Sequence, residues 1–223
     1  MTDAESDDTR WWWIRHAPVV DHRGQIYGSR DVPCDVSDTR AFAALAAAMP
    51  VGAVWVTSHL TRAKDTAAAI VRAGHAARAP IPGPIIERDL GEQNFGRWAG
   101  RTWDQIADED AETHDRFWTD PVGHAPPEGE SFAAVIARVR AAVDRLNVAH
   151  AGRDIVAVAH GGVIRAAVAI ALSLDAARAM AVRVDNLSLT RLDLVAGGTL
   201  RGRGGAWRVA GVNMPPLGNG LAP

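Results

Sequence analysis

One stretch of the sequence, residues 155–159, restricts the fold more than any other. It reads Ile-Val-Ala-Val-Ala, with an apolar side chain at every position. A strand with one solvated face would alternate apolar and polar residues, so this run predicts a central strand that is covered on both faces. His160-Gly161-Gly162 follows it, and residues 163–172 then predict a helix. A buried strand that leads directly into a helix is the repeating unit of an α/β fold.

The same alternation runs through most of the chain. Further strands are predicted at residues 11–14, 51–57, 85–90, 187–194 and 206–212. Further helices are predicted at residues 38–49, 60–73 and 131–148, with Asp38 and Ser131 as N-caps of the first and last. We therefore predict a three-layer α/β/α fold built on a mainly parallel, doubly wound sheet, with its ligand site at the carboxyl ends of the strands.

The length of 223 residues predicts one domain, which we place at residues 11–213. The acidic residues 1–10 are expected to form a disordered tail, and residues 214–223, which are rich in Pro and Gly, a flexible C-terminal tail. Residues 101–128 are expected to form an inserted, lid-like segment, with one or two surface helices between 102 and 118. No motif within this segment indicates what it binds.

Composition and charge exclude several classes of function. The formal net charge of -2 gives no support for nucleic-acid binding, which depends on clustered Lys and Arg. Cys34 is the only cysteine, so neither a disulfide within the chain nor a thiolate zinc site can form. No apolar stretch reaches the ~20 residues of a membrane span, and the acidic start is unlike a secretion signal. We expect a cytoplasmic protein that binds no membrane.

Polar residues follow three of the predicted strands, at Arg15-His16, at Ser58 to Arg62 and at His160-Gly161-Gly162. If these strands are neighbours, two imidazoles and two guanidiniums meet at one edge of the sheet, which is costly unless an anion neutralises them. A phosphoryl group suits this site. Arginine matches its oxygens, a helix N-terminus adds backbone amides, and a neutral imidazole can attack phosphorus.

Five blocks of the sequence resemble, in order, those of the histidine phosphatase superfamily, the phosphoglycerate mutase-like proteins. The blocks are Arg15-His16-Ala17, residues 58–67, Leu90-Gly91-Glu92 with residues 96–100, Gly129-Glu130-Ser131 with Arg138-Val139, and residues 158–162. The resemblance implies three catalytic residues, His16 as covalent nucleophile, Glu92 as proton donor and His160. It also implies that Arg15, Arg62, His160 and Gly161 bind the phosphate. No metal and no organic cofactor is implied.

The sequence departs from the superfamily's pattern at three positions. Ala17 replaces the usual Gly and requires a negative φ there. Val19 and His22 replace a usual Ser or Thr and a usual Asn, so His22, Gln25 and Tyr27 become candidate substrate contacts, with Ser29 as a further replacement.

Two assignments stay open at this point. Alternative acids near Glu92 are Glu87, Asp89, Glu128 and Glu130. His59 is expected at the rim of the site, and the remaining histidines, His75, His114, His124 and His150, show no metal-ligand spacing.

The leading functional hypothesis is a histidine acid-type phosphatase that hydrolyses a small organic phosphomonoester and is inhibited by phosphate or vanadate. The alternatives are a cofactor-dependent phosphoglycerate mutase-type transferase and a non-catalytic phosphate-binding member of the fold. Only 68 positions separate Glu92 from His160, whereas the mutases carry a longer segment, which favours hydrolysis. Residues 15–31 are similar to the α-ribazole phosphatase-like branch, so α-ribazole phosphate is a candidate substrate. A homodimer through exposed tryptophans is left open.

Overall fold

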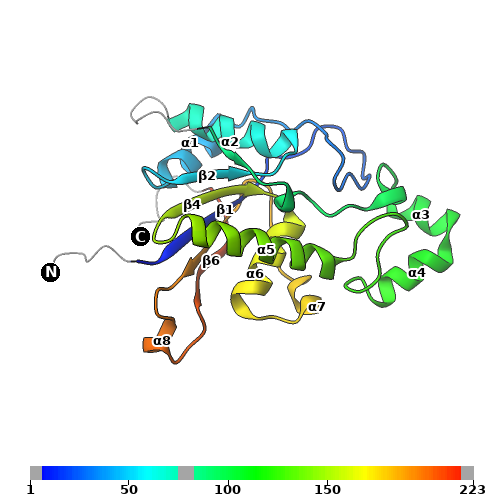
Figure 1. The fold of residues 1–223 in the computed structure, drawn as a ribbon. Helices are drawn as coiled ribbons and strands as arrows, with labels where there is room; N and C mark the ends of the chain where they lie inside the picture. Colours follow the sequence, from blue (N-terminus) through cyan, green and yellow to red (C-terminus); the bar gives the residue numbers. More distant parts are fainter. Residues whose placement is uncertain (1–6, 75–82, 217–223) are drawn as a thin grey trace.

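The computed structural model of the protein describes residues 7–74 and 83–216. Its centre is a six-stranded sheet in the order β3-β2-β4-β1-β5-β6 (Figure 1). The strands are β1 (Thr9–Arg15), β2 (Val54–Thr57), β3 (Ile85–Ile86), β4 (Asp154–Ala159), β5 (Leu189–Leu194) and β6 (Trp207–Met214). The pairs β1/β4, β4/β2 and β2/β3 are parallel, whereas β5 is antiparallel to both β1 and β6. The predicted mainly parallel α/β sheet is confirmed, with β5 reversed.

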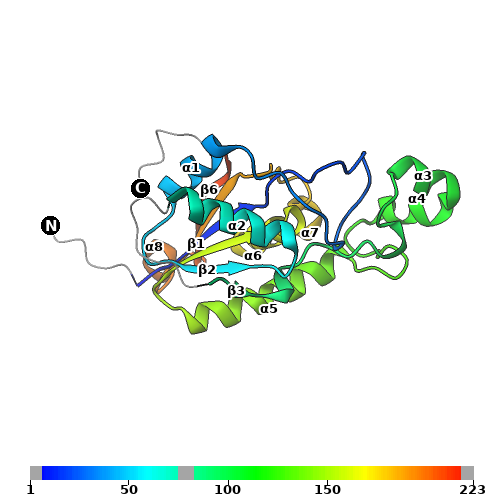
Figure 2. The same cartoon turned by 90° about the horizontal axis from the view of Figure 1, so that it is seen from above.

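Helices cover both faces of this sheet, as the predicted three-layer fold requires. Helices α1 (Thr39–Ala48) and α2 (Thr61–Gly74) lie on one face, and α5 (Phe132–Ala149) and α6 (Gly161–Leu172) lie on the other (Figures 1 and 2). Alternate residues of β1 serve the two layers, because successive side chains of a strand point to opposite faces. Trp11 and Trp13 pack with α5 and α6, whereas Trp12 and Ile14 pack with α1 and α2.

The central strand behaves as its composition predicts. Every residue from Ile155 to Ala159 is fully buried, and their side chains alternate between the two core clusters. Asp154, at the start of β4, accepts hydrogen bonds from Arg10 and from the indole of Trp12. The strand is therefore fixed at its polar end by side chains and along its length by apolar packing.

Several predicted boundaries need correction. β1 begins at Thr9 and pairs Arg10 with Asp154, so the predicted N-terminal tail is two residues too long. β6 ends at Met214, which pairs with Leu189, so the predicted C-terminal tail begins one residue too early. β2 begins at Val54 because residues 51–52 form a turn, and the predicted strand at 85–90 ends at Ile86 and becomes the 3₁₀ helix η1 (Arg88–Leu90). The short helices η2 (Gly96–Trp98), α7 (Ala176–Ala179) and α8 (Thr199–Gly202) were not predicted. Residues 1–6 and 217–223 of the two predicted tails, and His75, lie outside the described residues.

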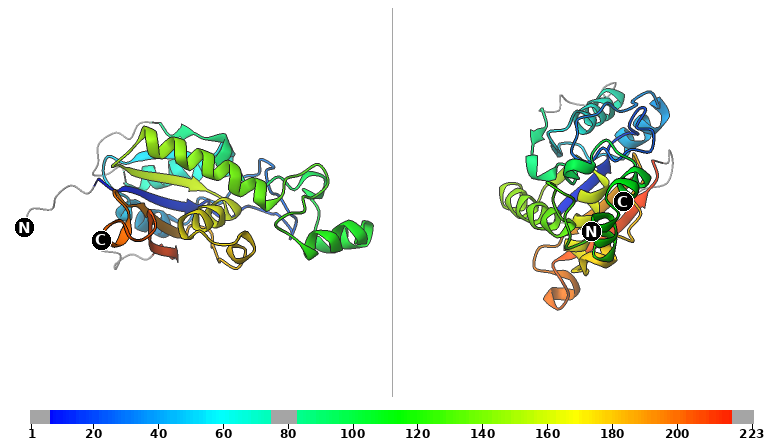
Figure 3. Two further views of the ribbon diagram at one scale, coloured as in Figure 1. Left: turned by 60° about the horizontal axis from the view of Figure 1, so that its bottom comes forward. Right: turned by 90° about the vertical axis from the view of Figure 1, so that its right-hand side faces the viewer.

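Two surface helices form in the predicted inserted segment. They are α3 (Trp103–Glu109) and α4 (Ala111–Thr119), and they project beyond the carboxyl ends of the strands, away from the start of β1 (Figures 2 and 3). A small core of its own, centred on Trp98, Ile106 and Phe117, holds this projection together. Among the described residues, none of the helices is both long enough and apolar enough to cross a membrane.

Candidate active site

The register of the parallel strands places the two histidines side by side. Arg15 of β1 lies opposite Ala159 of β4, so the residue after each strand is a histidine at the same edge. The backbone N–H of His16 donates to the carbonyl of Ala159 at 3.0 Å. The imidazole centroids of His16 and His160 are 5.1 Å apart, and both side chains are fully buried. His16 and His160 therefore lie side by side at one edge of the sheet, where they were expected from the sequence.

The hydrogen bonding of His16 leaves one ring nitrogen unprotonated, with a free lone pair. Nδ1 lies 2.6 Å from the carbonyl oxygen of Ala17, which can only accept, so Nδ1 carries the proton. Nε2 is buried and has no hydrogen-bond partner among the described residues. Burial, assisted by the nearby Arg62 guanidinium, lowers the pKa of His16 to about 3. The ring is therefore neutral at pH 7, the state in which Nε2 is a nucleophile.

His160 is oriented by a serine at the end of the neighbouring strand. The hydroxyl of Ser58 lies 2.7 Å from Nε2 of His160 and also accepts from the backbone N–H of Leu60. Nδ1 of His160 is buried without a partner in the described part of the chain. Burial, together with His16 and Arg62, holds the pKa of His160 well below its usual value. An anion beside this ring would oppose that effect and favour the protonated, donating form.

These buried neutral histidines make stability depend on pH. Below pH 6.5 the unfolded chain binds a proton at His16 that the folded chain, with a pKa of about 3, does not bind. The contribution of the neutral His16 ring to stability is therefore fully present above pH 6.5 and is lost as the pH falls toward 3. We expect the free energy of unfolding to fall by about 2.5 kcal/mol between pH 7 and 4.5 from His16 alone, and His160 acts in the same direction.

Urea unfolding at both pH values checks this expectation. The variant His16→Gln is the control, because it removes this titration while the other groups remain. Its unfolding free energy should change less between the two pH values than that of the wild type. An equal change in both proteins would contradict the buried, neutral state of His16.

Arg62 is held by the loop before α1 and points its guanidinium into the site. Its two terminal nitrogens donate to the carbonyls of Arg30, at 2.7 Å, and Gly28, at 2.6 Å. The guanidinium also lies over the ring of Tyr27, 5.0 Å from the centroid. Arg62 is fully buried, its Nε has no partner among the described residues, and no described carboxylate lies within 4.0 Å. A buried cation in this state favours a bound anion.

Gly28 allows the loop to approach Arg62 closely. Its φ is 44°, a conformation that favours glycine, and a Cβ atom there would lie 2.7 Å from the carbonyl oxygen of Gln93.

Arg15 completes the positive side of the site. One terminal nitrogen donates to the carbonyl of Val184 at 2.6 Å, while its Nε is buried without a partner in the described part of the chain. Asn186 donates its side-chain amide to the carbonyl of His16 at 2.8 Å and so fixes the loop that carries the nucleophile. Residues 184–186 lie just before β5, which starts beside the carboxyl end of β1 and runs antiparallel to it.

Glu92 is a carboxylate that lies beside these groups. Its two oxygens accept from the backbone N–H of Gly162, at 3.2 and 3.3 Å, at the N-terminus of α6. Gly161 lies between Arg15 and Glu92, because a Cβ atom there would be 3.7 Å from Nε of the arginine and 3.9 Å from an oxygen of the glutamate. The predicted phosphate-binding Gly161 is thus within the site.

The alternative acids are engaged elsewhere or exposed. Glu130 receives a bidentate hydrogen bond from Arg138, and Glu87 and Asp89 both pair with Arg145. Glu128 is an exposed residue whose nearest charged partner is the exposed Arg97. The geometry therefore favours Glu92 over all four.

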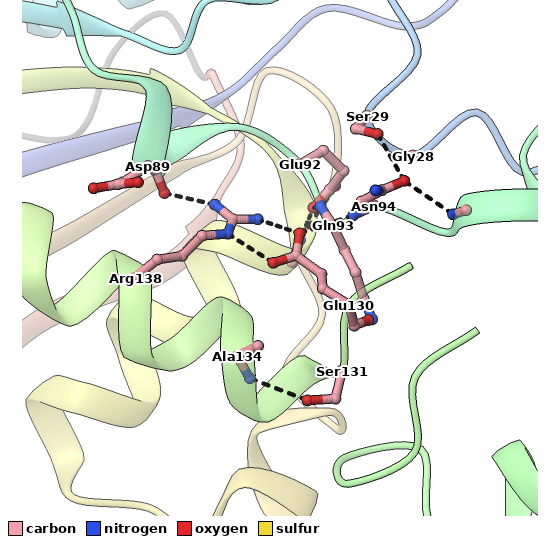
Figure 4. Close-up of polar contacts among 12 residues, drawn as sticks. Gly28, Ser29, Asp89, Glu92, Gln93, Asn94, Glu130, Ser131, Ala134 and Arg138 are labelled. Atoms are coloured by element: carbon pink, nitrogen blue, oxygen red, sulfur yellow. Dashed lines mark hydrogen bonds and ion pairs between the residues drawn. The ribbon is translucent and has the colours of Figure 1, made fainter. Parts of the chain in front are cut away.

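The Glu130–Arg138 pair has a structural role that Figure 4 shows. A carboxylate oxygen of Glu130 accepts from the backbone N–H of Asn94, its carbonyl accepts from the side chain of Gln93, and Arg138 also donates to the carbonyl of Asp89. These bonds fix the chain on both sides of Glu92. The third and fourth sequence blocks thus work together, one supplying the carboxylate and the other holding its loop.

The three candidate substrate contacts differ in their positions. Tyr27 is at the site, with its ring centroid 6.3 Å from that of His16. His22 is exposed, with its ring centroid 5.9 Å from that of Tyr27, and Gln25 is exposed with no side-chain hydrogen bond to the described residues. Ser29 donates to Asn94. Only Tyr27 contacts the buried groups.

The departures from the superfamily's pattern are accommodated by the backbone. Ala17 is not among the residues with positive φ, as its methyl group requires, and its N–H donates to the hydroxyl of Thr66 at 2.9 Å. Val19 forms an isolated bridge with Cys34 and supplies no polar side chain. The roles of Thr66 and Asn186 were not predicted. Thr66 lies in a recognised block, whereas nothing in the sequence around Asn186 marks it.

His59 is half-buried at the rim, and a Cβ atom at Gly91 would lie 2.8 Å from its ring. Burial and the positive charge of Arg88 lower the pKa of His59. Within residues 7–74 and 83–216, no group of three or more His, Cys, Asp or Glu side chains is arranged to hold a metal ion.

The fold and the site together define an α/β protein with a buried histidine pair and two arginines at the carboxyl ends of its parallel strands. The sequence profile of the histidine phosphatase superfamily (branch 1) matches residues 11–202, and the chain belongs to this superfamily.

Solved structures share this fold. The putative α-ribazole-5'-P phosphatase of Escherichia coli has a TM-score of 0.78 at 24% identity, covering 95% of this chain and 99% of that one. Mycobacterial glucosyl-3-phosphoglycerate phosphatase has a TM-score of 0.75 at 27% identity, covering 93% and 99%. Structures of the latter protein are known with VO3 and with inorganic phosphate.

Among curated relatives, the bifunctional protein Rv2228c of Mycobacterium tuberculosis is 35% identical over 162 residues, which are 70% of this chain and 42% of that protein. The chain thus spans less than half the length of the curated relatives that it matches.

Proposed function

We propose that the protein is a phosphomonoesterase that hydrolyses a small organic phosphate through a phosphohistidine on His16. The observation that carries this proposal is the convergence of four buried nitrogens without partners among the described residues. They are Nε2 of His16, Nδ1 of His160, and Nε of Arg15 and of Arg62. Nδ1 of His160 and the two arginine nitrogens can donate to phosphoryl oxygens. Nε2 of His16 carries the lone pair that attacks phosphorus.

The reaction has two steps. In the first, Nε2 of His16 forms a bond to phosphorus, the bond to the leaving oxygen breaks, and Glu92 gives its proton to that oxygen. In the second, water attacks phosphorus, the N–P bond breaks, and Glu92 takes a proton from the water. Arg15, Arg62 and His160 bind the phosphoryl oxygens throughout. The products are an alcohol and inorganic phosphate, and the enzyme is returned to its starting state.

Hydrolysis of p-nitrophenyl phosphate in EDTA tests the proposal. We expect turnover that releases inorganic phosphate and p-nitrophenol in equal amounts and that vanadate inhibits. A mutase would instead pass the phosphoryl group to a second substrate oxygen, such as that of 3-phosphoglycerate, and release little inorganic phosphate. Absence of turnover with any phosphomonoester would indicate a phosphate-binding protein and would contradict the proposal. The names of the structural neighbours make α-ribazole phosphate and glucosyl-3-phosphoglycerate the first natural candidates for a screen.

A single methyl group tests the role of Glu92. A Cβ atom at Gly162 would lie 2.5 Å from Oε1 of Glu92, so Gly162→Ala must displace this flexible carboxylate. We expect kcat to fall roughly 10- to 100-fold, since a displacement of about 1 Å has this effect on catalytic groups, with no loss of thermal stability. Gly205→Ala is the control, because this exposed glycine lies outside the site and its methyl group would meet nothing within 4 Å. Equal activity of the two variants would remove Glu92 from the mechanism.

A further inference from the structure

A pocket of about 240 Å³ opens beside Glu92, on the side of the lid-like segment. Glu92 and Gly162 both line it, so the carboxylate that we propose as the proton donor faces this pocket. A leaving oxygen that receives a proton from Glu92 must lie beside this carboxylate. The rest of the leaving group then extends into the pocket.

The walls of this pocket are mostly aromatic. They are formed by Phe95, Trp103, Phe117, Trp118, Phe132 and Met180, with Gln93 as a further polar residue. The rings of Trp103 and Trp118 are 4.9 Å apart, and that of Phe95 is 6.3 Å from Trp103, so they form one continuous aromatic surface. Such a surface favours flat, apolar ligands, which stack on it or meet it edge to face. A cavity of roughly 150 Å³ is enough for benzene, so this one has room for a ring with a substituent.

One cation lies among these aromatic residues. Arg165 of α6 is half-buried, lines the pocket, and donates from Nε to the carbonyl of Val182 at 2.8 Å. Within the described residues it has no carboxylate partner within 4.0 Å. Burial lowers the pKa of Arg165. The negative charge of Glu92 opposes this effect and the positive charge of Arg15 adds to it, so both groups interact electrostatically with the Arg165 guanidinium. An unpaired guanidinium at an apolar wall matches a carboxylate, which it can bind with two parallel hydrogen bonds.

We propose that this pocket binds the leaving group, and that the natural substrate is a phosphomonoester whose alcohol carries an aromatic ring and a carboxylate. The ring lies against Trp103 and Trp118, and the carboxylate binds Arg165. This inference rests on the proposed phosphatase function and names the substrate class of the same site.

Three model substrates and one variant test the carboxylate. The kcat/KM values for phenyl phosphate, 4-carboxyphenyl phosphate and glycerol 3-phosphate are measured with the wild type and with Arg165→Gln. We expect the preference for 4-carboxyphenyl over phenyl phosphate to fall roughly 10- to 100-fold in the variant, as for loss of a charge-assisted hydrogen bond. The different reactivities of the two phenols cancel in this ratio. Arg140→Gln, the same charge change at an exposed position of α5, should leave the preference unchanged.

The aromatic surface is tested with Trp118→Ala, because this side chain is half exposed and its loss spares the small core. We expect kcat/KM for phenyl phosphate to fall about tenfold more than that for glycerol 3-phosphate. Equal losses for these two substrates, or a carboxylate preference that persists in Arg165→Gln, would overturn the proposal while leaving the phosphatase function intact. Failure to hydrolyse all three substrates would overturn the phosphatase function itself.

Discussion

His16→Ala should lower kcat for p-nitrophenyl phosphate by at least about 10⁴-fold, because a covalent catalyst that loses its nucleophile retains only binding and electrostatic assistance. The expected loss is in kcat, and phosphate binding should persist because Arg15, Arg62 and His160 remain. The fold should also persist. The imidazole is fully buried, and its removal deletes one hydrogen bond to the Ala17 carbonyl and no strand pairing. Far-ultraviolet circular dichroism and phosphate binding by calorimetry check both points.

The control for this variant is His22→Ala. His22 is exposed and its ring contacts that of Tyr27, not that of His16, so its loss should change kcat less than about threefold. Activity of His16→Ala within tenfold of the wild type would contradict the assignment of the nucleophile.

Arg62→Lys should lower kcat/KM by roughly 10²- to 10³-fold, the usual effect of removing an oriented donor from a transition-state oxygen. Lysine keeps the positive charge but has no planar fork, so it cannot bind the carbonyls of Gly28 and Arg30 and a phosphoryl oxygen at the same time. We choose lysine over alanine because alanine would leave both carbonyls without a donor in a buried site. Steady-state kinetics and the inhibition constant of inorganic phosphate measure the change, and both should worsen.

The matched control is Arg97→Lys, which makes the same exchange at an exposed arginine of η2. It should behave as the wild type. Parallel small effects in both variants would mean that Arg62 holds the loop at residues 28–30 without binding the phosphoryl group.

Much of the fold follows from local sequence. The run at residues 155–159 is apolar throughout and is the fully buried central strand, and Asp38 and Ser131 cap the helices they were expected to cap. The reversed direction of β5 and the short helices α7 and α8 could not be predicted from local sequence patterns. Their positions depend on where the chain returns after α6, and four-residue helices have too few residues for a periodic pattern.

The candidate site divides in the same way. The proximity of His16 and His160 could be predicted from sequence, because a parallel register places the carboxyl ends of β1 and β4 at one edge of the sheet. The resemblance favoured Glu92, but local patterns could not separate it from the four other acids. The ion pairs of Glu87 and Asp89 with Arg145, and of Glu130 with Arg138, depend on how α5 packs against this region. Arg165 was missed for a related reason: its exposure to the aromatic pocket depends on how α3 and α4 pack beyond the sheet.

The most direct test of the central claim is to trap the phosphoenzyme. The protein is mixed with ³²P-labelled phosphomonoester, quenched in alkali within milliseconds, and digested so that the labelled peptide can be sequenced. We expect a label that is stable in alkali, labile in acid and located on His16, with a rate of formation at least equal to kcat. A label on another residue, or no label in a protein that turns over, would contradict covalent catalysis by His16.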